Sequence, residues 1–286
     1  MTDSSFSLLP GGRGTQDAPP DRLVDAVSVR GLTHQYVSGG RTFTALDNVD
    51  FHAKAGEFVT IVGPSGCGKS TLLFLIAGIH AKQEGVIDVL GQPVTGPGNR
   101  DTGFVFQKDA LLPWKTALEN VALPLKFRGV STKAAHREAA DWLHRVNLKG
   151  FENHYPSQLS GGMRKRVAIA SSLVYQPKVL MMDEPFSALD AQTRNFMQND
   201  LLRIWEETRQ TVIYITHDLE EAVGLSDRVV TMSATPGRIL TERSVPLPRP
   251  RNLLEIRFEP EFVEMHEQLW QDLREQVLQT GFGGHR

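Results

Sequence analysis

A glycine-rich loop between two apolar runs constrains the fold more than any other feature of the chain. The loop extends from Gly63 to Ser70 and matches the pattern G-x-x-x-x-G-K-[ST]. Residues 57–62 before it form a β-prone run that becomes apolar toward its end, which is typical of a buried parallel strand. Residues 70–77 after it form an apolar run that is suited to open a helix. Strand, glycine loop and helix in this order predict a phosphate-binding loop within an α/β fold.

The residue types of this loop suit the binding of a nucleotide. Glycines let backbone N–H groups approach the phosphates, and the helix N-terminus adds a partial positive charge. We expect Lys69 to reach the β- and γ-phosphates and the Ser70 hydroxyl to hold Mg²⁺. The expected nucleotide contacts in this stretch are Gly63, Pro64, Ser65, Gly66, Cys67, Gly68, Lys69, Ser70 and Thr71. The loop alone predicts nucleotide binding but not its purpose.

The composition indicates a globular protein of one large or two smaller α/β domains. The chain has 286 residues, 40% of them hydrophobic, and a net charge of −2 that gives no electrostatic argument for nucleic acid or anionic membrane. No apolar stretch approaches the roughly 18–20 residues that span a bilayer, and the N-terminal residues lack the pattern of a secretory signal. The single cysteine, Cys67, excludes an intrachain disulfide and reads as a small filler of the phosphate loop.

A second apolar run delivers two acidic residues. Residues 179–182 are apolar and lead into Asp183 and Glu184. In open α/β folds, ligands bind at the carboxyl edge of the sheet, where such a strand would place both acids. Asp183 can coordinate Mg²⁺ beside Ser70, and Glu184 can polarise an attacking water.

The order of patterns along the chain predicts its organisation. Residues 1–22 are rich in Ser, Gly, Pro and Asp and read as a disordered leader. β-Prone runs around the turn signal at Gly39 and Gly40 predict a small antiparallel sheet. A mostly helical insertion is expected near 108–167, and alternating helix and strand then predict a parallel sheet. After a proline cluster, residues 251–286 are expected to form an amphipathic helical tail on the domain 23–250, with apolar positions Phe262, Met265, Leu269, Leu273 and Val277.

Within that helical insertion and its surroundings, two helices have specific positions. Ser131 and Thr132 predict a helix start, followed by apolar positions Ala135, Ala139, Leu143 and Val146. A second helix is indicated after Glu184 by Phe196, Leu201, Ile204 and Trp205, and a strand by residues 211–215.

A second glycine-containing motif lies about ninety residues after the phosphate loop. Ser160, Gly161 and Gly162 follow Leu159, about twenty residues before the run that ends in Asp183. Together with the phosphate loop, this Leu-Ser-Gly-Gly run resembles the signature of the ATP-binding cassette (ABC) family. The resemblance implies a P-loop NTPase (RecA-like) parallel sheet core with an antiparallel β subdomain and a helical signature subdomain. It also implies that the signature completes the ATP site of a second subunit.

The resemblance extends to weaker elements in the family's order, over about two-thirds of the chain. It implies that Gln107 is the Q-loop glutamine that senses Mg²⁺ and γ-phosphate, and that His217 is the switch histidine that contacts the γ-phosphate. Residues 187–190 resemble the D-loop that crosses the dimer interface. Tyr36 occupies the position of the aromatic residue that stacks on adenine, although a tyrosine there is equally compatible with packing at a sheet edge.

The chain departs from the family pattern after the signature. Lys165 stands where glutamine is more common, and Ser171 and Ser172 stand where arginine and alanine are more common, so a contact that braces the signature helix is in doubt. Residues 110–121 and 233–239 are similar to ATPase subunits of importers for nitrate, sulfonates and taurine. That similarity implies that exposed apolar residues around Trp114 dock a permease, although Trp114 could instead cap a local core.

The resemblance implies an ATPase that binds ATP and Mg²⁺ as a head-to-tail homodimer. Such a subunit energises membrane permease chains, works indirectly with a solute-binding protein and lies peripherally on the cytoplasmic face of the membrane. The alternative is a soluble ABC-type ATPase that acts on nucleic acid or ribosomes. Proteins of that kind usually carry two cassettes or a long coiled-coil insertion, whereas this chain has one cassette, no sustained heptads and no basic stripe, which favours the importer and predicts no nucleic-acid partner.

Overall fold

Ten strands form two sheets in this computed structural model, which describes residues 25–282. The antiparallel sheet has the order β2-β1-β4-β5 and consists of β1 (Asp25–Ser38), β2 (Arg41–Lys54), β4 (Glu84–Val89) and β5 (Gln92–Pro93). The larger sheet has the order β10-β9-β3-β8-β7-β6 and consists of β10 (Ile239–Ser244), β9 (Arg228–Met232), β3 (Phe58–Val62), β8 (Thr211–Thr216), β7 (Val179–Asp183) and β6 (Thr102–Val105). The leader expected at 1–22 lies outside the described residues.

The larger sheet brings the ends of its central strands to one edge. Strand β3 pairs in parallel with β8 and β9, and β7 pairs in parallel with β6 and β8, while β10 is antiparallel to β9. All residues of β3, β7, β8 and β9 are buried, because layers cover both faces of this sheet. The segments that follow β3, β7 and β8 therefore emerge together, and they carry the phosphate loop, Glu184 and His217.

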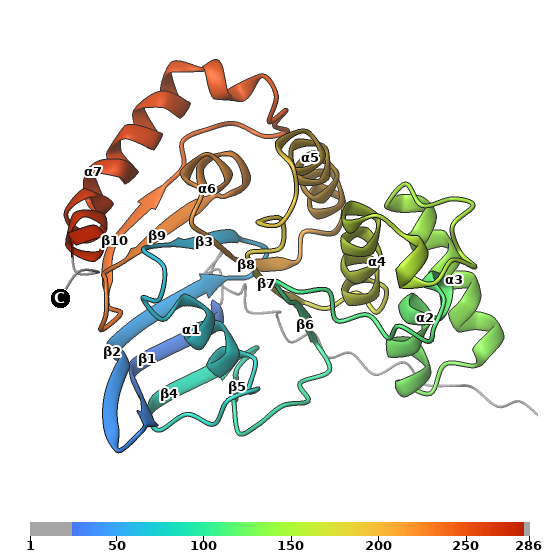
Figure 1. Ribbon diagram of the computed structural model, residues 1–286, viewed down its shortest axis with the longest axis horizontal. Coiled ribbons are helices and arrows are strands. Elements are labelled where there is room, and N and C mark those ends of the chain that lie inside the picture. Colours follow the sequence, from blue (N-terminus) through green and yellow to red (C-terminus); the bar gives the residue numbers. More distant parts are fainter. Residues whose placement is uncertain (1–24, 283–286) are drawn as a thin grey trace, which may run out of the picture.

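The antiparallel sheet is larger than the sequence predicted. The turn at Gly39 and Gly40 has left-handed φ angles of 57° and 76°, as a two-residue hairpin between right-twisted strands requires. The hairpin β1–β2 confirms the predicted sheet, and β4 then pairs with β1, which the sequence analysis did not anticipate. Helix α1 (Lys69–Ile76) lies between this sheet and the larger one (Figure 1) and buries Leu72, Leu73 and Leu75 against both.

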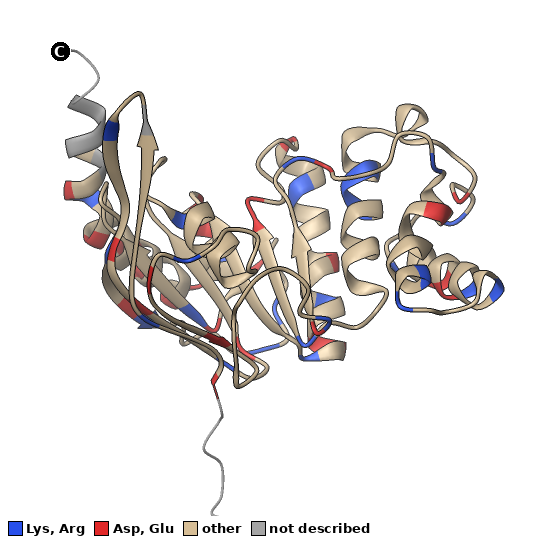
Figure 2. Cartoon of the chain, turned by 90° about the horizontal axis from the view of Figure 1, so that it is seen from below, with Lys and Arg blue, Asp and Glu red and all other residues tan. Residues whose placement is uncertain are grey.

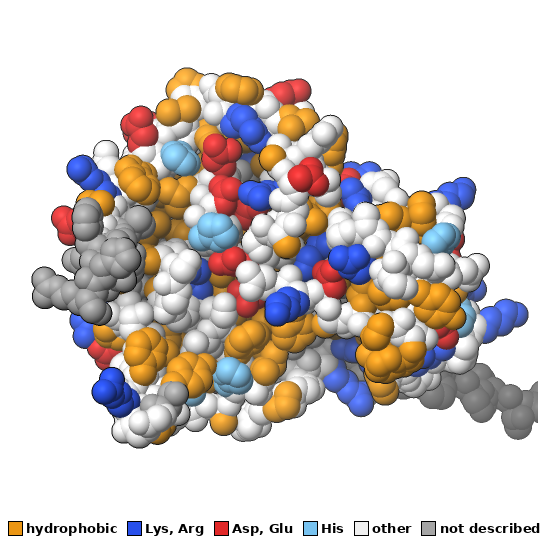
Figure 3. All heavy atoms as spheres, viewed as in Figure 1, with side chains coloured by type: hydrophobic (Ala, Val, Ile, Leu, Met, Phe, Trp, Pro, Cys, Tyr) orange, Lys and Arg blue, Asp and Glu red, His pale blue; other side chains and the backbone are white. Residues whose placement is uncertain are grey.

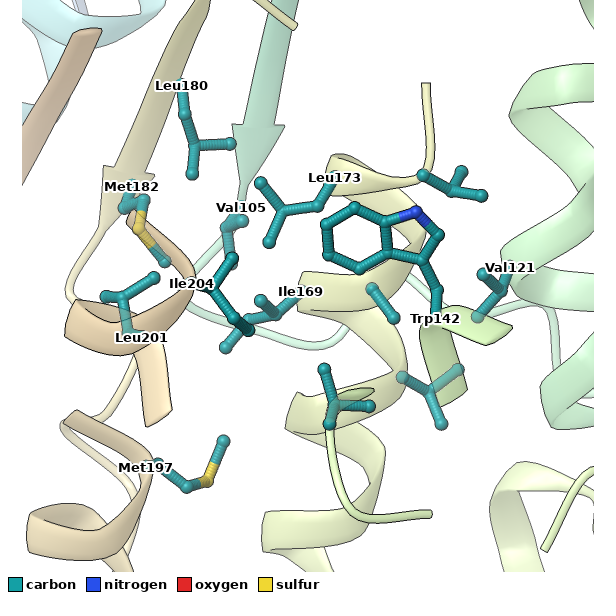
Figure 4. Close-up of a cluster of buried hydrophobic side chains, with 14 of the residues drawn as sticks. Val105, Val121, Trp142, Ile169, Leu173, Leu180, Met182, Met197, Leu201 and Ile204 are labelled. Carbon is teal, nitrogen blue, oxygen red and sulfur yellow. The ribbon is translucent and has the colours of Figure 1, made fainter. Parts of the chain in front are cut away.

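Three helices form a lobe beyond β6, which we call the helical lobe: α2 (Ala117–Phe127), α3 (Thr132–Arg145) and α4 (Gly161–Leu173), with a short 3₁₀ turn at Pro156–Gln158. Helix α3 confirms the predicted helix start, because Ser131 caps it and Ala135, Ala139 and Leu143 are buried. Figure 4 shows the side chains that join the lobe to the sheet, with Trp142 of α3 beside Leu173 of α4, and Leu180 of β7 on the other side. One continuous apolar core therefore connects α4 to the strand that carries Asp183.

The face of the larger sheet opposite α1 carries α5 (Ala191–Thr208), α6 (Leu219–Leu225) and α7 (Pro260–Phe282) (Figure 1). A 3₁₀ turn at Ile256–Phe258 precedes α7. The predicted apolar positions of the C-terminal helix pack on α6 and β9, namely Phe262, Met265, Leu269 and Leu273, whereas the side chain of Val277 is not described. Phe196 lies on α5 as predicted, but it is 52% exposed and faces away from the core that Leu201, Ile204 and Trp205 enter. Within residues 25–282, no helix has the length and apolar character needed to cross a membrane.

Candidate nucleotide site

The phosphate loop connects β3 to α1 through positions that only glycine fits. Gly68 has a φ of +100°, and a Cβ there would lie 2.8 Å from the carbonyl oxygen of Ala45. A Cβ on Gly63 would lie 2.9 Å from the carbonyl oxygen of Met232. Neighbouring backbone therefore touches the loop from two sides and fixes its path, so the loop is held before any ligand arrives.

Lys69 is folded back over this loop. Its ammonium donates hydrogen bonds to the carbonyl oxygens of Gly63, at 2.8 Å, and Pro64, at 2.9 Å, and the residue is only 5% exposed. Cys67 is buried beside it, and burial raises the pKa of the Cys67 thiol. The thiol therefore stays protonated, in keeping with a filler rather than a reactive group.

Ser70 and Asp183 place two hard oxygen donors side by side. The Ser70 hydroxyl donates to Oδ1 of Asp183 at 2.9 Å, across 113 residues of sequence. Burial raises the pKa of Asp183, and the hydrogen bond from Ser70 partly opposes this shift. No group of three or more His, Cys, Asp or Glu side chains that could hold a metal occurs in the described part of the chain. An ion bound to Ser70 and Asp183 would take its other ligands from Gln107, waters or phosphates, and Mg²⁺ is usually held by a few protein oxygens in this way.

Glu184 is the centre of a polar cluster just beyond that pair. Its Oε2 lies 3.2 Å from Nδ1 of His217 and 3.3 Å from Nε2 of Gln107, which also lies 3.5 Å from Oγ of Ser187. The Ser187 hydroxyl donates to the backbone carbonyl of Glu184 at 3.0 Å. The Glu184 backbone is left-handed, with φ 39°, which is unusual outside glycine. The structure thus brings together three residues that the sequence places 77 and 33 positions apart.

Tyr36 lies near the start of α1, partly exposed. Its hydroxyl is 3.3 Å from Oγ1 of Thr71 and 3.3 Å from Nδ1 of His80. The ring of His34 packs edge-on against the tyrosine ring. These contacts tether the phenol and leave 37% of the residue exposed, which is compatible with either expected role. His80 was missed, because nothing in its local sequence connects it to a tyrosine 44 residues earlier.

The signature turn (Ser160, Gly161 and Gly162) lies elsewhere, at the start of α4. Ser160 caps the helix by accepting a hydrogen bond from the backbone of Met163, and Ser160 and Gly161 are exposed. A Cβ on Gly162 would lie 2.9 Å from Cγ2 of Thr193 on α5, so the turn also needs its glycine for packing. In residues 25–282, no hydrogen bond or ion pair joins this turn to the phosphate loop.

The combination at the sheet edge suits nucleotide hydrolysis. A glycine loop with its lysine can bind a nucleotide chain of phosphates, the Ser70–Asp183 pair suits a divalent ion, and Glu184 is available to a water. The fold and the site therefore define a P-loop nucleotide hydrolase.

Comparisons with known proteins make the class specific. The family model for the ABC transporter matches residues 46–187. The aliphatic sulfonates import ATP-binding protein of Bacillus cereus is 43% identical, over 88% of this chain and 94% of that protein. The nitrate import ATP-binding protein of Synechocystis is 45% identical, over 87% of this chain and 95% of that protein. The chain belongs to the ABC transporter family and is an ABC-type ATPase.

A solved structure confirms the fold class. It is the dimeric, post-hydrolysis state of an ATP-binding cassette bound to ADP and phosphate, which is 35% identical to this chain with a TM-score of 0.70. The match covers 78% of this chain and all of that one. The parallel core with an antiparallel subdomain and a helical signature subdomain, expected from the sequence, is therefore confirmed.

Proposed function

We propose that this ATPase energises a membrane importer for a small solute of the nitrate, sulfonate or taurine class. The observation that carries the proposal is the match to sulfonate and nitrate import subunits along 94% and 95% of their own lengths. Solute selectivity resides in partner chains, so the ATPase itself indicates a class of solutes. The proposed domain spans residues 23–250, with a helical subdomain near 108–167. The tail 251–286 follows it, and the described part of the tail, which ends at residue 282, packs on the domain.

The nucleotide is held mainly at the sheet edge. Backbone amides of residues 63–71 surround the phosphates, and Lys69 leaves its carbonyl partners to neutralise the β- and γ-phosphates. Tyr36 stacks on the adenine. The partly exposed ring and its tethered hydroxyl support this role, because a fixed ring loses little freedom when a base stacks on it.

Hydrolysis uses the cluster around Glu184. Ser70, Asp183 and Gln107 would hold Mg²⁺, which would supply positive charge to the phosphate oxygens. Glu184 accepts a proton from the attacking water as general base. His217 contacts the γ-phosphate, and its distance of 3.2 Å from Glu184 lets one histidine orient the base as well.

The site is completed by a second copy of the chain. The signature turn is exposed at a helix N-terminus, where backbone N–H groups and the helix dipole favour a phosphate. A head-to-tail homodimer places the signature turn of each chain against the ATP of the other and encloses two ATPs. The dimeric state of the 35% identical cassette supports this arrangement.

The helical lobe is the proposed docking surface for the permease. Hydrophobic side chains gather over α2 in the space-filling view (Figure 3), and Trp114 and Phe127 are 69% and 80% exposed. A groove of about 440 Å³ next to Phe127 is lined by this residue and by Phe104, Phe106 and Leu111, among others. We place the ATPase at the cytoplasmic face of the membrane, bound through this lobe, with a solute-binding protein acting on the far side of the permease. Basic and acidic residues are interspersed over the view in Figure 2, a distribution that gives the nucleic-acid alternative no support.

Growth of the source organism tests the import function. Deletion of the gene should abolish growth on one sulfonate, taurine or nitrate as sole sulfur or nitrogen source. The wild-type gene should restore growth and Glu184→Gln should not, whereas Glu267→Gln, at an exposed position on α7, serves as the matched control. Unchanged growth of the deletion strain on all three classes would contradict the proposed solute class.

A further inference from the structure

Lys165 is a buried cation on α4 that the proposed chemistry does not use. Its side chain is 5% exposed. The ammonium donates hydrogen bonds to the backbone carbonyls of Phe106, at 3.1 Å, and Gln107, at 2.9 Å. It also lies 2.9 Å from Oδ1 of Asp109, as an ion pair without hydrogen-bond alignment. All three partners of the ammonium belong to residues 106–109, which we call the Q-loop segment.

A buried ammonium is costly unless it is paired, so these contacts are specific rather than incidental. The neighbouring residue strengthens the attachment: Arg164 Nε lies 3.4 Å from Oδ2 of Asp109, and its guanidinium donates to the carbonyl of Leu159 at 2.8 Å. Two consecutive basic residues of α4 therefore form ion pairs with Asp109. The Q-loop segment has to follow α4 if α4 moves, because breaking these contacts would leave the buried Lys165 ammonium and two backbone carbonyls unpaired.

The position of Lys165 connects the two proposed halves of the ATPase. Lys165 lies on the helix that Ser160 caps, one and a half turns from the signature turn. The residue whose carbonyl it holds, Gln107, reaches Glu184 at 3.3 Å with its own side chain. Lys165 thus lies between the signature turn, which is proposed to contact the nucleotide of the partner chain, and Gln107, which is proposed to act in the ATP site of the same chain.

We propose that Lys165 is a positioning residue that couples the two ATP sites of the dimer. When the signature turn engages the partner's nucleotide, α4 shifts, and Lys165 carries the Q-loop segment with it, so that Gln107 is set against Glu184 in the chain's own site. This inference rests on the proposed head-to-tail dimer. It predicts that loss of Lys165 impairs turnover and cooperativity but not the binding of ATP to one chain.

The test compares Lys165→Met and Lys165→Gln in the full-length protein. Methionine is unbranched and of similar length without a donor, whereas the glutamine amide keeps two N–H donors for the two carbonyls. We expect Lys165→Met to lower kcat about 10- to 100-fold, the loss typical of a small misplacement in an active site. The Hill coefficient for ATP should fall from about two toward one. ATP affinity, from fluorescence titration without turnover, should change less than about twofold. Lys165→Gln should recover part of both kcat and cooperativity.

Lys178→Met is the matched control, because Lys178 also pairs with an aspartate, Asp101 at 3.2 Å, but is 67% exposed. Wild-type kcat and Hill coefficient in Lys165→Met would overturn the inference, as would a loss of ATP affinity that accounts for the lower rate. If Lys165→Met does not fold, the Hill coefficient of Lys165→Gln decides alone. A value below that of the wild type supports the inference, and the wild-type value overturns it. A wild-type protein that hydrolyses ATP without cooperativity would instead overturn the proposed dimer, and the coupling with it.

Discussion

The sheet edge and the signature turn are the two places proposed to contact phosphates, and they differ in what holds them. At the sheet edge, side chains from distant segments hold one another, as in the pairs Ser70–Asp183 and Glu184–His217. At the signature turn, Ser160 bonds only to the first turn of its own helix and is exposed. On the proposed function, the sheet edge therefore needs only one chain to bind ATP, whereas the signature turn becomes a site only when a second chain arrives. Binding and turnover should respond differently to changes at the two places.

The largest effect is expected from Glu184→Gln, at the sheet edge. The change keeps size and hydrogen-bonding reach but removes the negative charge and most of the basicity. Because a positioned general base contributes about 10²–10⁴-fold, turnover should fall by that factor while Mg-ATP still binds. Steady-state hydrolysis and nucleotide titration measure the two quantities, with Glu267→Gln as control. Near-normal turnover would remove Glu184 from the role of base.

Next is Ser160→Arg, at the signature turn. A bulky cation there should block closure of the dimer, so hydrolysis should fall about 10²-fold, similar to the loss of one transition-state donor. Binding of ATP to a single chain should stay within about twofold, because within residues 25–282 no hydrogen bond or ion pair joins the turn to the phosphate loop. Ser244→Arg, exposed at the end of β10, is the control. Normal hydrolysis by Ser160→Arg would end the contrast between the two regions.

Lys69→Ala should show the opposite pattern. It removes a charge that meets the β- and γ-phosphates, and hydrogen bonds to charged groups contribute about 1.5–3 kcal/mol, so Kd should rise about 10- to 100-fold. Equilibrium titration of one chain with ATP measures this directly. Lys178→Ala removes an exposed lysine and should leave Kd unchanged. An unaltered Kd in Lys69→Ala would show that the loop does not hold the phosphates as described.

The smallest effect is expected on the free energy of unfolding, from a change at Asp183 of the sheet edge. Burial raises the pKa of Asp183, so the folded chain retains this proton to a higher pH than the unfolded chain does. The carboxyl favours folding below its unfolded pKa and loses that contribution as the pH rises through the folded value. At neutral pH, Asp183→Asn should therefore increase the free energy of unfolding by about 0.5–2 kcal/mol while weakening Mg-ATP binding.

Denaturant unfolding at several pH values tests this trade-off. The advantage of Asp183→Asn over the wild type should grow from acid to neutral pH, whereas Asp141→Asn, at an exposed position on α3, provides the baseline for an aspartate change. A variant less stable than the wild type at neutral pH would mean that Ser70 and Asp183 stabilise the fold and are not held there at a cost.

Local patterns explain which parts of this molecule could be predicted. The strands β3, β7 and β8 are short apolar runs, and the cap at Ser131 lies next to the helix that it starts, so each was evident within a few residues. Non-local contacts were not evident. Strand β4 joins β1 across about 60 residues, and Lys165 meets the carbonyl of Gln107 across 58.

The same distinction applies within the site. Glu184 was predicted from the apolar run that precedes it, and Gln107 and His217 were predicted through their family motifs. The distances among the three residues depend on strand order, which none of these patterns encodes. The exposure of Phe196 depends on how α5 is rotated against β7, and its apolar character alone suggested burial. The contacts that brace α4 also could not be predicted from the sequence. Arg166 of α4 pairs with Asp200 at 2.6 Å, and Ser172 of α4 donates to the carbonyl of Phe104 at 2.9 Å.

The central claim is that two chains close around ATP through their signature turns. Light scattering on size-separated Glu184→Gln, with and without Mg-ATP, tests it most directly. We predict a change from one chain of 31.8 kDa to a dimer when ATP is added, and no change in the double variant that also carries Ser160→Arg. A dimer of equal abundance in the double variant, or a strictly monomeric Glu184→Gln at high protein and ATP concentrations, would contradict the claim.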